Sequence, residues 1–133
     1  MNYISTRNNQ KNFTFKEVFL KGLADDGGLF VPKSLKQYKK EELDNLKSLS
    51  YNDLAAEIIY PFIGDFMSKD DLISTISKSY SNFRSNDVVK ISNLGSLKVL
   101  ELFHGPTLAF KDIAMQLIGN FYQYHLGRDQ KKI

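Results

Sequence analysis

Cysteine is absent from this chain of 133 residues, and histidine occurs only twice, at His104 and His125. Without cysteine there is no disulfide bond, no thiolate ligand for a metal and no cysteine nucleophile. Two histidines are also too few for a histidine-rich metal site, so we expect no metal. These absences leave lysine, carboxylate and hydroxyl side chains as the candidates for chemistry.

Long apolar runs are missing as well. No stretch approaches the roughly 18 apolar residues that a transmembrane helix needs. The first residues, from Met1 to Arg7, lack the apolar core of a secretory signal peptide. We therefore expect no membrane association and a cytoplasmic location.

The excess of positive charge is small. Lysine and arginine total 18 against 15 aspartate and glutamate residues, which gives a formal net charge of +3. The basic residues form no stripe and are not interleaved with aromatic stacking platforms. A small basic module that binds nucleic acid or phosphate is therefore an alternative that the pattern does not favour. Ten phenylalanines and seven tyrosines indicate a folded core rather than disorder.

Local signals predict a helix close to the amino terminus. Thr14 and Glu17 have the spacing of a capping box, in which each side chain bonds the main chain of the other. The helix that follows should end at a turn over residues 25–28. A short extended piece is expected at residues 29–31, closed by a proline.

Three more helices are predicted in the first part of the chain. One covers residues 41–49, and two others open at capping residues, Ser50 and Ser68. Pro61 should end or kink the helix that begins at Ser50 at about Tyr60, because proline lacks the N–H that continues a helix.

The composition changes after Tyr80, where residues 81–87 are polar and typical of turns. We place a domain boundary there. Residues 1–83 are predicted to form a mainly helical domain, and residues 84–133 the start of an α/β domain. The predicted fold class of the chain is therefore α/β.

The second part of the chain reads as two strands followed by a long helix. The strands are predicted at residues 88–91 and 97–103. Thr107 is expected to cap a helix that runs to about Leu126, and Gly127 should follow its end.

Residues 131–133 resemble the first step into another strand. A single strand–helix step cannot bury both faces of a sheet. We therefore expect the chain to be the N-terminal part of a longer polypeptide, with a partner surface missing.

The segment from Glu101 to Asp112 is the candidate for chemistry, because it joins a predicted strand to a helix through a Gly-Pro turn. Such junctions bind ligands in open α/β sheets. Lys111 is expected about one turn into the helix, where the helix dipole and burial beside Phe110 would both favour a neutral amine. A neutral amine is the form that attacks an aldehyde.

Plainer interpretations of the same residues stay open. A lysine followed by an aspartate is usually a solvated pair, and His104 could be a hydrogen-bonded residue of the junction. Gly27 and Gly28 could serve only a tight turn. Arg7 could be a solvated side chain or could meet an anionic substrate.

The segment Glu-Leu-Phe-His-Gly-Pro-Thr-Leu-Ala-Phe-Lys-Asp at residues 101–112 closely resembles the cofactor-lysine segment of threonine synthases. The wider group of fold-type II pyridoxal-phosphate enzymes often has Pro-Thr-Gly-Ser-Phe-Lys-Asp there. Leu108 and Ala109 replace Gly-Ser, as in the longer branch of threonine synthases, which carries an extra N-terminal domain. Residues 3–7 and 22–32 resemble the start of the same enzymes.

The resemblance implies an incomplete fold-type II α/β domain after the helical domain. It implies pyridoxal 5′-phosphate attached covalently to Lys111, with Phe110 beside the cofactor and with His104 and Thr107 in substrate binding. The activity implied is that of a pyridoxal-phosphate-dependent lyase. It converts O-phospho-L-homoserine and water into L-threonine and phosphate.

The parts that would hold the cofactor phosphate and face its ring are expected downstream of this chain. The 133-residue chain alone is therefore expected to be inactive and to bind the cofactor weakly or not at all. A non-catalytic regulatory or interaction fragment that keeps the family's N-terminal domain is the alternative. The sequence gives no indication of oligomeric state.

Overall fold

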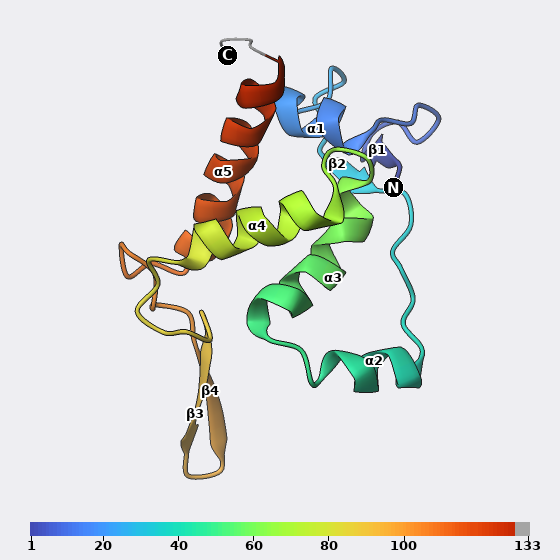
Figure 1. Ribbon diagram of the computed structural model, residues 1–133. Coiled ribbons are helices and arrows are strands. Elements are labelled where there is room, and N and C mark those ends of the chain that lie inside the picture. Colours follow the sequence, from blue (N-terminus) through green and yellow to red (C-terminus); the bar gives the residue numbers. More distant parts are fainter. Residues whose placement is uncertain (130–133) are drawn as a thin grey trace. The chain divides into compact units, whose positions relative to one another are not determined.

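The computed structural model describes residues 1–129 (Figure 1). Its contacts form two compact units, one of residues 1–49 and 53–72 and the other of residues 50–52 and from 73 onward. The elements in chain order are β1 (Tyr3–Ser5), α1 (Phe15–Lys21), β2 (Phe30–Pro32), α2 (Lys40–Leu46), α3 (Tyr51–Ile63), α4 (Lys69–Tyr80), β3 (Lys90–Leu94), β4 (Leu97–Glu101) and α5 (Asp112–Asp129). The expected mixture of helices and short strands is confirmed.

The capping box predicted at the start of α1 is present. The main-chain N–H of Glu17 donates to Thr14 Oγ at 3.3 Å, and Thr14 N donates back to Glu17 Oε2 at 2.7 Å. These bonds satisfy two donors that would otherwise have no partner in the first turn. The hydrogen bonds also hold the pKa of the Glu17 carboxyl below its ordinary value.

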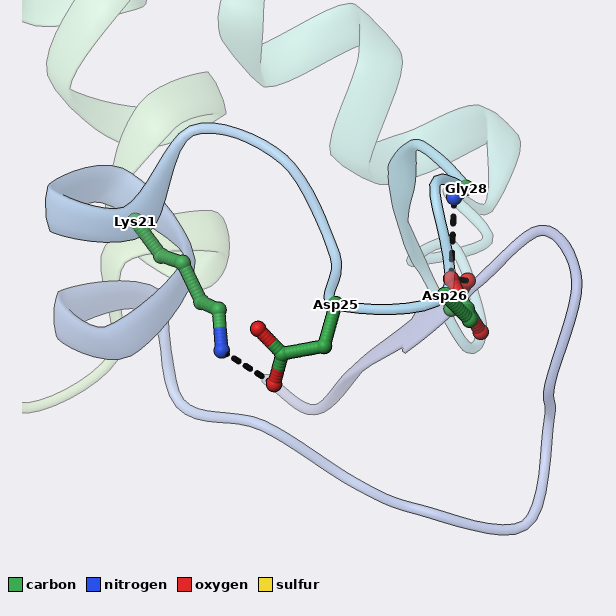
Figure 2. A network of polar contacts seen from close by, with 5 residues as sticks. Lys21, Asp25, Asp26 and Gly28 are labelled. Atoms are coloured by element: carbon green, nitrogen blue, oxygen red, sulfur yellow. Dashed lines mark hydrogen bonds and ion pairs between the residues drawn. The ribbon is translucent and has the colours of Figure 1, made fainter.

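Strands β1 and β2 pair in antiparallel fashion, with Tyr3 opposite Pro32 and Ser5 opposite Phe30. The turn before β2 is tied to β1 through Asp26. Its Oδ1 accepts from Ser5 Oγ at 2.8 Å and from Gly28 N at 2.9 Å. Figure 2 shows the Gly28 contact beside the ion pair between Lys21 and Asp25.

The structural interpretation of the early glycines is supported by this turn. Gly27 has a φ of 75°, which glycine adopts without strain. A Cβ on Gly28 would overlap the hydroxyl of Ser5, so the close approach of two backbone segments requires glycine there. Arg7 Nη1 donates to the main-chain oxygen of Asp26 at 3.1 Å, which gives Arg7 a structural role in the same turn.

Of the two effects predicted for Pro61, an end of the helix at Tyr60 is not observed. Helix α3 continues through Pro61 to Ile63, which is almost fully buried. A proline so close to the helix end removes one hydrogen bond, and burial of Ile63 offsets that loss. The helix stops at Gly64, whose φ is 59° and whose N–H donates to Tyr60 O at 3.3 Å.

The predicted start of α4 is confirmed, because Ser68 Oγ accepts from the main-chain N–H of Asp71 at 3.1 Å. Within the second unit, residues near the end of α4 contact α5. Tyr80 Oη donates to Ile113 O at 3.0 Å, and Asn120 Nδ2 donates to Ser79 Oγ at 2.9 Å. Burial raises the pKa of the Tyr80 hydroxyl.

Strands β3 and β4 are the two predicted strands, and they pair as an antiparallel hairpin. Their ends differ from the prediction. Val88 has a φ of 60°, a left-handed conformation that breaks an extended strand, so β3 begins two residues later. Strand β4 ends at Glu101 instead of Phe103. Gly95, with a φ of 61°, is the first of two loop residues, as a type II′ hairpin turn requires.

Helix α5 differs from the prediction at both ends. It begins at Asp112, five residues after the expected cap at Thr107, and it continues through Gly127 to Asp129. A glycine inside a helix costs about 1 kcal/mol relative to alanine, which is too little to end a long helix. The strand expected at residues 131–133 lies outside the described residues. In the part of the chain that is described, no helix has the length and apolarity to cross a membrane.

Leu72 is the residue whose replacement should test the core of the first unit. Its side chain is 0% exposed, so Leu72→Ala leaves a cavity and should lower the free energy of unfolding by about 2–5 kcal/mol. Urea denaturation followed by circular dichroism measures this change. Leu43→Ala, at a side chain that is largely exposed, is the matched control and should change stability by less than about 0.5–1 kcal/mol. Equal losses in the two variants would contradict the assignment of the core.

Candidate active site

The candidate site lies in the turn of residues 105–111, which leads from β4 into α5. Lys111 is the residue directly before α5, and its main-chain oxygen accepts from Ala114 N at 3.1 Å and from Met115 N at 2.9 Å. The prediction that Lys111 lies one turn inside the helix is therefore wrong. Because the lysine precedes the first helical residue, the direction of its side chain is set by the turn.

Asp112 closes this turn. Its Oδ2 accepts from Thr107 N at 2.8 Å, and its Oδ1 accepts from Thr107 Oγ at 2.8 Å. The carboxylate is held against the turn on a residue that is 4% exposed. Thr107, the expected helix cap, does not begin the helix. It donates both of these hydrogen bonds to Asp112, the first residue of α5.

Gly105 allows the close packing that this turn needs. A Cβ at Gly105 would overlap the side chain of Asp112, so no larger residue fits without moving the carboxylate. Leu108 has a φ of 63° in the same turn, although leucine rarely adopts this conformation. The two bonds from Thr107 to Asp112 therefore hold a backbone shape that local preference alone disfavours.

Lys111 and Phe110 are both exposed, with Phe110 65% exposed. The expectation that burial beside Phe110 favours a neutral amine is therefore wrong for this structure. The alternative of a solvated lysine–aspartate pair is not observed either, because both oxygens of Asp112 bond Thr107. Within residues 1–129, the amine of Lys111 has no hydrogen-bond or ion-pair partner.

His104 forms a hydrogen bond with Glu101, and their Nε2 and Oε2 atoms are 2.7 Å apart. The hydroxyl of Ser92, on the neighbouring strand, donates to the other oxygen of Glu101. The bonds from Ser92 and then from His104 hold the pKa of the Glu101 carboxyl below its ordinary value. This hydrogen bond fits the plainer interpretation of His104 as a hydrogen-bonded residue of the junction.

The structure brings some of the predicted residues together and leaves others apart. Thr107 bonds Asp112, and His104 bonds Glu101, but no hydrogen bond or ion pair joins His104 to Lys111 among the described residues. Ser92 and Glu101 were not among the predicted site residues. The alternation of side chains along the two strands could have indicated that Ser92 and Glu101 lie close together, because residues diagonal across a hairpin share one face.

Asp112→Ala should destabilise the second unit by about 1–3 kcal/mol, because Thr107 N loses its acceptor. Asp112→Asn should cost less, since an amide oxygen still accepts from Thr107 N and its NH₂ group still meets the hydroxyl. Thermal unfolding and amide hydrogen exchange at Thr107 measure these effects. Asp87→Ala, at an exposed carboxylate of the same unit, is the control. Equal stability of Asp112→Ala and wild type would show that the turn does not depend on Asp112.

Comparison with known proteins now adds to this geometry. Residues 2–80 match the family model described as the threonine synthase N terminus. A threonine synthase of Schizosaccharomyces pombe is 42% identical over 96% of this chain and 25% of its own length. One of Pseudomonas aeruginosa is 39% identical over 100% of this chain and 29% of its own.

A crystal structure of pyridoxal-phosphate-bound threonine synthase from Brucella melitensis superposes with a TM-score of 0.94 at 37% identity. The match covers 99% of this chain and 29% of that one. The chain therefore spans between a quarter and a third of the length of these relatives. Family model, sequence relatives and solved structure agree, and the chain belongs to the threonine synthase family.

Proposed function

We propose that this chain contributes the cofactor lysine, Lys111, to a threonine synthase. That enzyme converts O-phospho-L-homoserine and water into L-threonine and phosphate, as a pyridoxal-phosphate-dependent lyase. The observation that carries the proposal is the exposed amine of Lys111, which has no partner within residues 1–129 and follows a braced turn. Membership of the family supplies the reaction class.

The residues present fit pyridoxal phosphate in one respect that the structure tests. An aldehyde cofactor reacts with an accessible, unprotonated lysine amine. A carboxylate paired with that amine would favour the protonated form, which does not react. Lys111 is exposed, and the adjacent carboxylate is turned toward Thr107. Lys111 would hold the cofactor, and Phe110 offers an exposed ring beside it. When bound, pyridoxal phosphate supplies a sink for the electrons left when a proton is removed from the substrate.

In this proposal the amine of Lys111 moves protons at Cα and Cβ of the substrate. The turn fixes where the lysine starts, because Thr107 and Asp112 hold the backbone on one side of it. The hydroxyl of Thr107 and the ring of His104 are the polar groups proposed to contact the substrate. Their contribution is orientation of the substrate before proton transfer.

We also propose the division of the chain at residues 83 and 84 into a family-specific N-terminal domain and the start of the catalytic domain. The match of the family's N-terminal model to residues 2–80 supports a boundary close to that position. The lysine, the turn and the hydrogen bond between His104 and Glu101 would then all belong to the catalytic part.

Covalent labelling tests the role of Lys111. After incubation of the full gene product with pyridoxal phosphate and borohydride, we expect the reduced cofactor on the peptide that contains Lys111, detected by mass spectrometry. Lys111→Arg should abolish this label and reduce threonine formation by about 10³-fold or more, because arginine does not lose its proton at neutral pH. Lys98→Arg, in β4, is the matched control and should keep both. A label of unchanged yield in Lys111→Arg would overturn the assignment.

The 133-residue chain by itself should form no threonine from O-phospho-L-homoserine. It spans under a third of the length of its relatives, and the groups that would hold the cofactor phosphate are proposed to lie elsewhere. Threonine formation is measured by amino-acid analysis, and cofactor binding by absorbance near the pyridoxal band. Measurable turnover by the chain alone would show that these residues suffice.

A further inference from the structure

Three polar side chains, joined by hydrogen bonds, form a row along the hairpin that ends at the start of the candidate site. In the register of the hairpin, Ser92 lies opposite Val99 and Lys90 lies opposite Glu101. The hydroxyl of Ser92 donates to Glu101 Oε1, and Glu101 Oε2 lies 2.7 Å from His104 Nε2. The three groups come from β3, from the end of β4 and from the residues that follow β4.

Two members of this row of side chains are largely buried. The side chains of His104 and Glu101 are 17% and 18% exposed. The distance of 2.7 Å lies in the range of a charge-assisted hydrogen bond. Pairs withdrawn from water gain little stability after desolvation. The pair is therefore expected to add little to the stability of the hairpin. A role in ligand binding explains the pair better.

Three contacts hold His104 in place, two through its ring and one through its main chain. Its Nε2 is bonded to Glu101, its main-chain oxygen accepts from Arg84 N at 2.8 Å, and its ring centroid lies 4.8 Å from that of Phe103. Within residues 1–129, Nδ1 has no hydrogen-bond partner. In the protonated ring, Nδ1–H is a donor of fixed direction that carries positive charge.

We propose that Glu101, supported by Ser92, is a positioning residue that holds the ring of His104 as a hydrogen-bond donor for a phosphate monoester. This inference rests on the proposed function, in which His104 contacts the substrate. Two other charged groups lie near the pair and the candidate turn. Lys90 faces Glu101 from β3, and the carboxylate of Asp112 is occupied by Thr107, so it does not compete for His104.

A phosphate monoester could come from two sources, the substrate or the cofactor, and the chemistry of recognition is the same for both. The substrate carries a phosphate that leaves in the reaction, and the cofactor carries one that stays. Two measurements separate them: the KM for O-phospho-L-homoserine and the Kd for pyridoxal phosphate. A rise in either value on loss of Glu101 supports the proposal and names the source.

The primary test uses inorganic phosphate as the probe and the full gene product as the protein. Isothermal titration calorimetry gives the phosphate Kd for wild type, Glu101→Gln, His104→Ala and the double variant. Each single variant should weaken binding about tenfold, the size of one lost charge-assisted hydrogen bond. The double variant should bind no more weakly than His104→Ala, because Glu101 acts through His104.

Two controls accompany this test. Glu57→Gln removes the carboxylate of an ion pair with Lys69 in α4, and should leave the phosphate Kd unchanged. Ser92→Ala keeps Glu101 and His104 and removes only the outer hydrogen bond, so it should weaken binding about threefold. Ser92→Ala also serves as the test if thermal unfolding shows that Glu101→Gln has lost its fold.

An unchanged phosphate Kd in Glu101→Gln and in Ser92→Ala, or losses that multiply in the double variant, would overturn the inference. The result does not depend on turnover. If Lys111 takes no label while the phosphate Kd responds as expected, the proposed function fails and the anion site stands. If Lys111 is labelled and the Kd does not respond, the proposed function stands and this inference fails.

Discussion

The two hydrogen bonds between Asp112 and Thr107 are the constraint on which the candidate site depends. They fix both ends of a turn that contains a leucine with a φ of 63°. Gly105 permits the packing, because any Cβ there would overlap the carboxylate. Since Lys111 follows this turn and precedes α5, the position of its backbone depends on where the Asp112 carboxylate is held.

Carboxylates flank the candidate turn on both sides, and each is occupied by a neighbour that is not the lysine. Glu101 bonds Ser92 and His104 before the turn, and Asp112 bonds Thr107 after it. A carboxylate near an amine would stabilise its charged form. By engaging both carboxylates elsewhere, the fold leaves the Lys111 amine without a counterion within residues 1–129.

Local signals of the sequence predicted local structure well. The caps at Thr14 and Ser68 and the two strands on either side of Gly95 were found because each depends on residues within a few positions. The continuation of α3 through Pro61 could not be found, because the burial of Ile63 is a tertiary effect. The start of α5 was misplaced because Thr107 looks like a cap, and nothing local shows that Asp112 uses both oxygens on it.

The resemblance to the wider group of pyridoxal-phosphate enzymes shows which residues determine the turn. Those enzymes often have glycine where this chain has Leu108, and Leu108 has the left-handed backbone that glycine adopts freely. Thr107 and Asp112 are present in both patterns. The turn is thus compatible with a residue that disfavours it, provided that the Thr107–Asp112 pair is kept. Hydrogen bonding across the turn, rather than the flexibility of one residue inside it, therefore places the lysine.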